Sequence, residues 1–400
     1  MVRIIERRVR LAYPLGHHLH CLIAQIPNHL RRTRQGWRIS EPEGQWRTIR
    51  SVLELVAEGT GNLKKLHFLI LPESCVPIER LDDLLALVAA RFRPSTVTMF
   101  GLEHVRLQTY RELLERFRED NPQAIPLVDR DIDSGDVLDA PVNVGCVAVK
   151  DAEGRVRVFL EAKTHPFRGE EFLDKYEDQY RGRHIYLFRN EATPFNFMML
   201  VCLDYVYRNL YQSNIRAIID HANQLFFRSR QTLDALFVVQ SNPKPEHRVY
   251  RDVLSGFYGE YLEDTPGVRD TVTVFGNCSG ESEMGERDAG ATYGVSSVVI
   301  GPHQRLARVR NDEYSTDDFG GAPVCRLRFG TATRLYYLNL PQHHEIDPRS
   351  SRIPLKVHAL YRPGPGGRWI VAKPGDHPPE ARAGAPGEAP AGSPLTVEER

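Results

Sequence analysis

The sequence predicts an α/β protein with mixed sheets, and three observations lead to this fold class. Segments with a helical spacing of apolar residues recur along the chain. Between them lie short, almost wholly apolar runs, which are typical of buried strands. Two β-rich segments separated by a short turn indicate a hairpin. Alternating helices and strands favour an α/β core, and hairpins add antiparallel pairs to its sheets.

Three strands and three helices are expected before residue 120. The strands are residues 20–26, 66–71 and 96–100, which are short and apolar. The helices are residues 45–57, 78–92 and 105–117. In the first helix, one face carries Trp46, Ile49, Val52, Leu53 and Val56.

The middle of the chain begins with the hairpin. Residues 142–149 are β-rich, and the sequence DAEG at 151–154 is a turn. Residues 156–160 are expected to form the second strand of the hairpin. The elements expected after it are strands at 197–201, 236–240, 271–275, 293–300, 305–310, 324–329 and 335–340, with helices at 207–227 and 247–262.

The domain organisation expected is one large domain with two flanking segments. The 400 residues show no internal repeat, and residues 19–361 are taken as the domain. Residues 1–18 form an N-terminal extension. Residues 362–400 are rich in Pro, Ala, Gly and Glu and poor in large apolar side chains, so they are expected to be a disordered tail.

Composition excludes several classes of protein. The net charge of +0 argues against a protein that coats nucleic acid or an anionic membrane. No apolar run reaches the roughly 20 residues needed to span a bilayer, and the charged N-terminus does not resemble a signal peptide. The six cysteines form no CxxC pair, which argues against a zinc knuckle or a disulfide scaffold. The reducing cytoplasm is the expected compartment.

Three predicted strand ends each carry one reactive residue. Glu73 follows LILP, Lys163 follows VFLEA, and Cys202 follows FMMLV. Catalytic groups in α/β folds often lie beyond the carboxyl ends of strands. A thiolate is a strong nucleophile, a carboxylate can shuttle its proton, and an ammonium group can stabilise an oxyanion. Each residue alone has an ordinary structural role, as a cap, a solvated lysine or a core cysteine, so only the combination indicates catalysis.

The segments around these residues resemble the motifs of nitrilase-like carbon–nitrogen hydrolases. LILPES at 69–74 resembles the glutamate motif, KTHPFRGEE at 163–171 the lysine motif and LVCLD at 200–204 the nucleophile motif. The order Glu, Lys, Cys and the hairpin before the lysine also match. Residues 276–277 and YGVSSVVIGP at 293–302 resemble later family segments, so the resemblance spans residues 19–342.

The resemblance implies a four-layer α-β-β-α sandwich and a cofactor-independent, metal-free hydrolase. Glu73 would be the general base, Cys202 the nucleophile and Lys163 the oxyanion stabiliser, helped by the backbone N–H of Leu203. A second glutamate, Glu171 with Glu170 as the alternative, would position the substrate and the lysine.

The substrate implied is a small-molecule amide, in preference to a nitrile. The family's usual assembly is a homo-oligomer, a dimer or larger. Acyl transfer is a close chemical variant, and a non-catalytic or partner-regulated binding module is the alternative from another class. The segment 205–236 departs from the family, because it is long and lacks the usual Phe-Pro-Glu pattern.

Three other groups of residues could have a functional role. Asp204 either caps the following helix or orients the nucleophile turn, and the cap is preferred. His17, His18, His20 and Cys21 are interpreted as part of a strand, and His343, His344 and Glu345 as a loop, rather than as metal sites.

Overall fold

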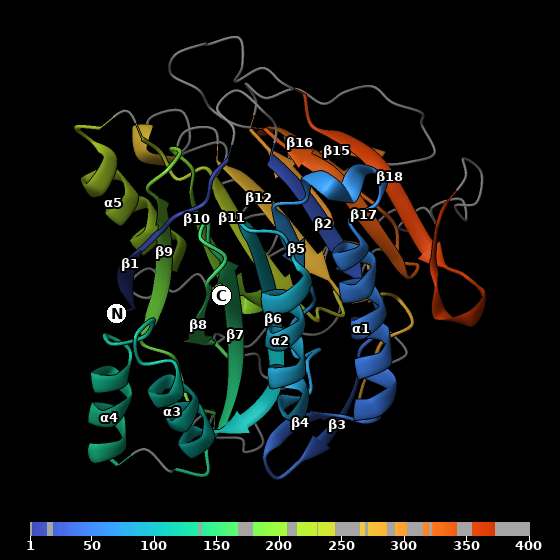
Figure 1. Cartoon of the computed structure of the whole chain (residues 1–400). Helices are drawn as coiled ribbons and strands as arrows, with labels where there is room; N and C mark the ends of the chain where they lie inside the picture. The colour runs from blue at the N-terminus through green and yellow to red at the C-terminus, as the bar shows by residue number, and fades with distance from the viewer. Residues whose placement is uncertain are drawn as a thin grey trace, which may run out of the picture.

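The computed structural model of the chain contains two eight-stranded sheets and one three-stranded sheet, with helices α1–α5 beside them (Figure 1). It describes residues 2–13, 19–135, 138–166, 179–205, 214–229, 231–244, 265–268, 271–285, 293–301, 315–319, 322–341 and 354–372. Both large sheets combine parallel and antiparallel pairs, which confirms the predicted mixed α/β class.

One large sheet, called here the β2 sheet, has β2 near its centre. In spatial order it contains β19 (Trp369–Val371), β18 (Lys356–Pro363), β17 (Arg334–Leu340), β2 (Leu19–Gln25), β5 (Phe68–Ile70), β6 (Thr96–Arg106), β7 (Pro141–Lys150) and β8 (Val156–Ala162). The parallel strands β2, β5 and β6 place their carboxyl ends at one edge.

The other large sheet is called the β10 sheet. In spatial order it contains β1 (Arg3–Val9), β9 (His184–Asn190), β10 (Asn196–Val201), β11 (Ala235–Gln240), β12 (Val272–Asn277), β14 (Ser297–Ile300), β16 (Ala322–Arg328) and β15 (Ser315–Phe319). Here β10, β11 and β12 run parallel. The small sheet is β13 (Glu283–Met284), β3 (His29–Thr33) and β4 (Gly36–Ile39).

Four helices pack on the outer face of the β2 sheet. They are α1 (Pro42–Glu58), α2 (Leu81–Arg91), α3 (Leu107–Arg116) and α4 (Ile125–Asp133). Their apolar stripes form one buried cluster with strand residues such as Leu69, Phe100 and Cys146. The fifth helix, α5 (Asn214–Phe226), forms another cluster with Leu200 and Val238 of the β10 sheet.

A third apolar cluster lies between the two large sheets. Phe68 of the β2 sheet stacks on Phe237 of the β10 sheet with ring centroids 4.9 Å apart, and it meets Phe197 edge-on at 5.4 Å. Because strand side chains alternate between faces, Phe68 enters this cluster and the neighbouring Leu69 enters the helix-facing cluster. The two sheets therefore bury their facing sides against each other.

Strands of both large sheets extend past the expected domain bounds. Within the expected N-terminal extension, residues 3–9 form β1, an edge strand of the β10 sheet that pairs in parallel with β9. The ordered region also continues beyond 361: β18 runs to Pro363, and β19 pairs with it. The Trp369 Nε1–H donates to Ser51 Oγ at 2.9 Å and ties β19 to α1. Residues 373–400, most of the predicted tail, lie outside the described residues.

Most predicted elements occur within a few residues of their expected bounds. Strand β6 runs on to Arg106, past the predicted end at 100, because it pairs with β7 as far as Leu102 and again at Val105 and Arg106. Helix α4, strands β9, β15 and β18 and the three strands of the small sheet were not predicted. The helix expected at 247–262 and the strand at 305–310 lie outside the described residues.

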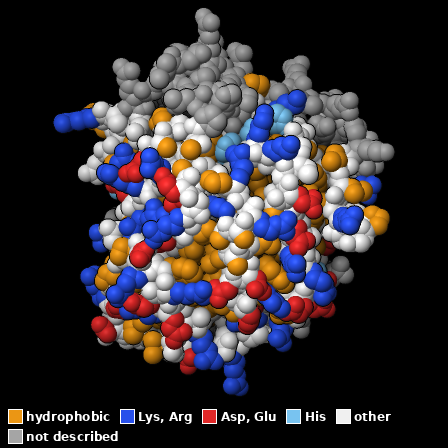
Figure 2. Space-filling model, in the orientation of Figure 1, with side chains coloured by type: hydrophobic (Ala, Val, Ile, Leu, Met, Phe, Trp, Pro, Cys, Tyr) orange, Lys and Arg blue, Asp and Glu red, His pale blue; other side chains and the backbone are white. Residues whose placement is uncertain are grey.

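The visible surface carries charges of both signs. Figure 2 shows Lys and Arg side chains interspersed with Asp and Glu over the described part of this face. Exposed pairs such as Arg50–Glu54, at 2.8 Å, contribute little to stability. Among the described helices, none is long and apolar enough to cross a membrane.

Candidate active site

Glu73 lies just beyond the carboxyl end of β5, where the chain passes close to β6. A Cβ atom on Gly101 of β6 would lie 2.3 Å from the backbone nitrogen of Ser74 and 2.7 Å from Cα of Glu73. Only glycine therefore permits this approach. The Gly101 N–H donates to the carbonyl of Pro72 at 3.0 Å, which fixes the segment before Glu73.

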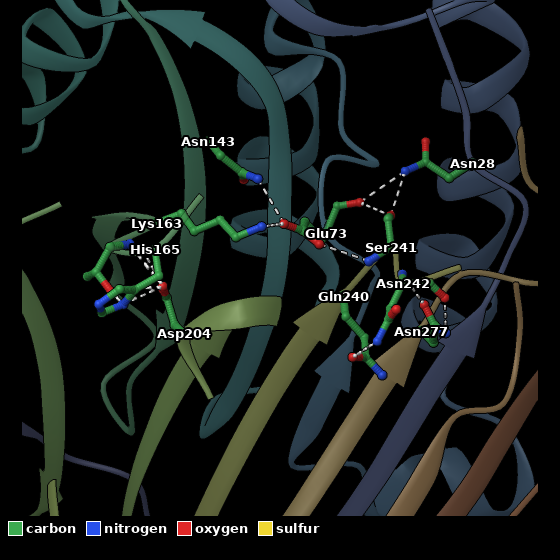
Figure 3. A network of polar contacts seen from close by, with 11 residues as sticks. Asn28, Glu73, Asn143, Lys163, His165, Asp204, Gln240, Ser241, Asn242 and Asn277 are labelled. Carbon is green, nitrogen blue, oxygen red and sulfur yellow. Dashed lines mark hydrogen bonds and ion pairs between the residues drawn. The ribbon is translucent and has the colours of Figure 1, made fainter. Parts of the chain in front are cut away.

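The carboxylate of Glu73 is held by three donors from three segments (Figure 3). Lys163 Nζ lies 2.9 Å from Oε1, and Asn143 Nδ2 donates to the same oxygen at 2.8 Å. The backbone N–H of Ser241 donates to Oε2 at 2.9 Å. Glu73 is 4% exposed and Lys163 1% exposed, so this is a buried ion pair whose charges are compensated by each other and by neutral donors.

Lys163 lies immediately after β8, and its backbone is fixed on both sides. Its N–H donates to the carbonyl of Asn143 at 2.8 Å, and its carbonyl accepts from the N–H of Gly182 at 2.9 Å. Asn143 therefore holds both members of the pair, Lys163 through its backbone and Glu73 through its side chain. The lysine is a structured, dry part of the site rather than a solvated residue at the end of a hairpin.

Cys202 follows β10 in an unusual backbone conformation. Leu200 faces α5 and Val201 faces the other sheet, so regular alternation would turn residue 202 toward α5. The φ angle of Cys202 is +46°, in the left-handed region, and its side chain joins the cluster between the sheets. Such a conformation costs about 1–3 kcal/mol for a residue other than glycine, and strain of this kind concentrates at functional sites.

The strand register brings Cys202 to the same edge as Glu73. Val201 is paired with Val239 of β11, and Ser241, two residues beyond Val239, donates to Glu73. On the opposite sheet, a Cβ on Gly145 of β7 would lie 2.8 Å from Val201 Cγ2. The end of β10 therefore packs directly on the strand that carries Asn143, beside the Glu73–Lys163 pair.

Four other described cysteines differ from Cys202 in their surroundings. Burial raises the thiol pKa of Cys21, Cys75 and Cys146 far above its usual value, and it raises that of Cys278 to about 12. Such thiols stay protonated and unreactive near neutral pH. Cys202 is 8% exposed and is the one of these five whose backbone has a positive φ.

Asp204 accepts hydrogen bonds from the lysine segment. Its Oδ1 accepts from the Thr164 N–H at 3.0 Å, the Thr164 hydroxyl at 2.8 Å and the His165 N–H at 2.8 Å. These contacts favour the interpretation that Asp204 orients the nucleophile turn. A helix cap was preferred from the sequence, and the residues that such a cap would contact, 206–207, lie outside the described residues.

Polar residues that were not predicted to be catalytic complete the site. Asn28 Nδ2 and the Ser241 hydroxyl both donate to the carbonyl of Glu73, at 3.0 and 2.8 Å. Asn277 Oδ1 accepts from the Asn242 N–H at 2.9 Å, and Asn277 Nδ2 donates to the Asn242 carbonyl at 3.1 Å. Ser241 and Asn28 follow predicted strands, so their position beyond a carboxyl end was the signal available in the sequence.

Two further predictions remain untested. Glu171, with its alternative Glu170, lies outside the described residues. The role of the Leu203 N–H as an oxyanion donor remains a prediction. Within the described part of the chain, no group of three or more His, Cys, Asp or Glu side chains could hold a metal ion.

Comparison with known proteins finds matches among solved structures. No protein-family model matches the chain, and no curated protein matches its sequence. Among solved structures, a CN-hydrolase superfamily protein from Xanthomonas campestris, described with an arsenic adduct in the active site, is similar in fold, with a TM-score of 0.44. The two chains are 13% identical, and the match covers 81% of this chain and 91% of that chain.

Proposed function

We propose that this protein is a nitrilase-like hydrolase that cleaves a non-peptide carbon–nitrogen bond through a thioester on Cys202. One observation carries the proposal. A buried Glu73–Lys163 pair, at 2.9 Å, lies at the edge where β10 ends and Cys202 turns back between the sheets with a φ of +46°. A core cysteine needs neither a strained backbone nor a dry ion pair beside its strand end.

The fold supports the same proposal. The first apolar cluster lies between helices α1–α4 and the β2 sheet, and the second lies between the two large sheets. The third lies between the β10 sheet and α5. This order is the one expected of a four-layer α-β-β-α sandwich. In such an arrangement the carboxyl ends of β5 and β10 meet across the layer between the sheets, and their reactive residues meet with them.

The proposed reaction has two halves. Glu73 accepts the thiol proton as Cys202 Sγ attacks the carbonyl carbon of an amide, and the resulting oxyanion is stabilised by the Lys163 ammonium and the Leu203 N–H. Glu73 then gives the proton to the leaving nitrogen as the C–N bond breaks. Water attacks the thioester next, with Glu73 as base, and releases the acid and the thiol.

An amide is proposed in preference to a nitrile as the substrate class. With an amide, the proton that Glu73 holds after the attack by the thiol passes to the leaving nitrogen. Cys202, Glu73 and Lys163 supply the required groups, so the proposal involves no cofactor. The homo-oligomer expected from the sequence remains part of the proposal.

The experiment that tests the function is intact-mass analysis of the full chain with iodoacetamide and with a panel of small amides. Wild type is compared with Cys202→Ala and with Cys146→Ala, which removes a buried thiol of β7. We expect one rapid alkylation and, with a suitable amide, an acyl adduct. Both should persist in Cys146→Ala and vanish in Cys202→Ala.

The opposite result would favour a different class of protein. If Cys202 is alkylated no faster than the buried cysteines and no amide leaves an adduct, the catalytic proposal fails. The fold would then be interpreted as a nitrilase-like binding module.

A further inference from the structure

The nucleophile turn and the lysine segment belong to different sheets, and one buried carboxylate joins them. Cys202 and Asp204 follow β10 of the β10 sheet, whereas Thr164 and His165 follow β8 of the β2 sheet. Asp204 is 3% exposed. Its two oxygens receive two backbone N–H groups and one hydroxyl, at distances of 2.8–3.2 Å.

Asn214, the first residue of α5, ties the same two segments a second time. Its Nδ2 donates to the Thr164 hydroxyl oxygen at 2.8 Å and to the carbonyl of Asp204 at 3.0 Å. Asn214 is 1% exposed, so both bonds are made away from water. The Thr164 hydroxyl thus accepts from Asn214 and donates to Asp204, and its oxygen also lies 2.7 Å from His165 Nδ1.

The position of this connection determines what it can control. Thr164 is covalently attached to Lys163, whose Nζ lies 2.9 Å from Glu73 Oε1. Cys202 is two residues before Asp204 in the same 3-10 turn, Cys202–Asp204. A shift of about 1 Å between reacting groups costs on the order of 100-fold in rate. Asp204 is two residues from Cys202, and Thr164 is next to Lys163. The bonds between Asp204 and Thr164 can therefore keep the thiol and the ammonium group within about 1 Å of their working positions.

We propose that Asp204 is a positioning residue that sets the distance between the Cys202 thiol and the Lys163 ammonium group. The inference rests on the proposed function and extends it, since it assigns the alignment of nucleophile and oxyanion stabiliser to one carboxylate that touches neither substrate nor reacting atoms. Asn214 has a supporting part, because it orients the Thr164 hydroxyl toward Asp204.

The electrostatic surroundings make the effect measurable. Among the described residues, the charged or titratable groups around the connection include Lys163, Glu73, His165, Asp204 and Glu161. If Asp204→Asn lets Lys163 move away from Cys202, the thiolate loses the cation that stabilises it, and the thiol pKa rises. If instead the charge of Asp204 acted on the thiol directly, removal of that charge would lower the thiol pKa. The two roles therefore predict shifts of opposite sign.

A matched control lies at the other end of the same strands. Asp234, 8% exposed, accepts from the N–H of Asn196 at 2.7 Å and from the Thr232 hydroxyl at 3.3 Å, and so joins the starts of β10 and β11. Asp234→Asn disturbs a comparable buried carboxylate without touching the candidate site.

The test compares Asp204→Asn with Asp234→Asn in the full chain. Measurements are the melting temperature, the pH profile of iodoacetamide alkylation at Cys202, and kcat and KM for an amide found by screening. We expect both variants to melt lower. Only Asp204→Asn should raise the midpoint of the alkylation profile and lower kcat about 100-fold, with KM changed less than threefold. Thr164→Val, which keeps the two N–H donors and loses the hydroxyl, should shift the profile in the same direction by less.

Three results would overturn the inference. An alkylation profile unchanged in Asp204→Asn, beside a lower melting temperature, would mean a structural role alone. A downward shift would mean direct electrostatic action on the thiol. If Asp204→Asn does not fold, an unchanged profile in Thr164→Val excludes the positioning role. Failure of the proposed function is visible separately, in the wild type, as slow and unselective alkylation of Cys202.

Discussion

Each end of β10 is held by a buried aspartate. One aspartate connects two strands of the same sheet, and the other connects the two large sheets. At the amino end, Asp234 binds the N–H of Asn196 and links neighbouring strands of one sheet. At the carboxyl end, Asp204 binds Thr164 and links one sheet to the other, beside Cys202 with its positive φ. A carboxylate within a sheet contributes stability, whereas one between sheets also fixes how the sheets are aligned.

The carboxyl end also holds several energetically costly features. It holds a buried ion pair, a left-handed Cys202 and a second left-handed residue, Ser74, with a φ of +52°. Such features persist only when the surroundings over-determine them. The network of Asn28, Asn143 and Ser241 supplies that constraint. The difference between the two ends predicts which substitutions will damage function and which only stability.

The largest effect is expected from Glu73→Gln. It leaves the Lys163 ammonium buried with a neutral partner, so the free energy of unfolding should fall by about 3–5 kcal/mol. Hydrolysis should fall about 100- to 10,000-fold because the general base is lost. Urea unfolding and steady-state kinetics measure the two effects.

A double variant sharpens this prediction. Lys163→Met combined with Glu73→Gln removes both charges, and we expect it to be more stable than Glu73→Gln alone. Equal stability of the single and double variants would mean that the pair is not the source of the loss.

The next effect in size concerns the close approach of β6 to the glutamate segment. In Gly101→Ala the new methyl group would lie 2.3 Å from the nitrogen of Ser74, so Glu73 must move. We expect a loss of about 3 kcal/mol in the free energy of unfolding together with lost activity. Gly44→Ala in α1 is the control, because its nearest neighbour is 3.4 Å away and alanine favours a helix. A fully active Gly101→Ala would show that Glu73 does not depend on this contact.

The smallest effect concerns acid sensitivity. Burial lowers the pKa of His184 to about 4, and its Nε2 lies 3.2 Å from the carbonyl of Leu160 in the other sheet. Below pH 6.5 the unfolded chain takes up a proton that the folded chain refuses, so stability falls as the pH drops toward 4. At pH 5 the loss is about 2 kcal/mol.

The measurement is the free energy of unfolding against pH for wild type and His184→Gln, in which the amide can still donate to Leu160. In the variant, the free energy of unfolding should fall less between pH 6.5 and 4 than it does in wild type. Part of the fall that remains in the variant is due to His67, because burial lowers the pKa of His67 to about 3. Identical curves would remove His184 from the explanation.

Local sequence features predicted most of the central elements and missed the strands near the two ends of the described chain. The apolar face of residues 45–57 became α1, and the hairpin around DAEG became β7 and β8. Residues 3–9 were not recognised as a strand, because an edge strand that alternates charged and apolar residues is similar to a solvated segment. The strand at 369–371 was hidden by the Pro- and Gly-rich composition around it.

The sequence by itself determined which residue types were available for chemistry, and where in the chain they stood. Glu73, Lys163 and Cys202 each follow a predicted strand, and that position was readable because strand ends follow from local apolar runs. Only the tertiary structure decided the partners: Asn143 and Ser241 on Glu73, and Asp204 on Thr164. These contacts join residues 40–168 positions apart. They depend on how two sheets stack and on where glycine lets backbones approach, which no local pattern of residues encodes.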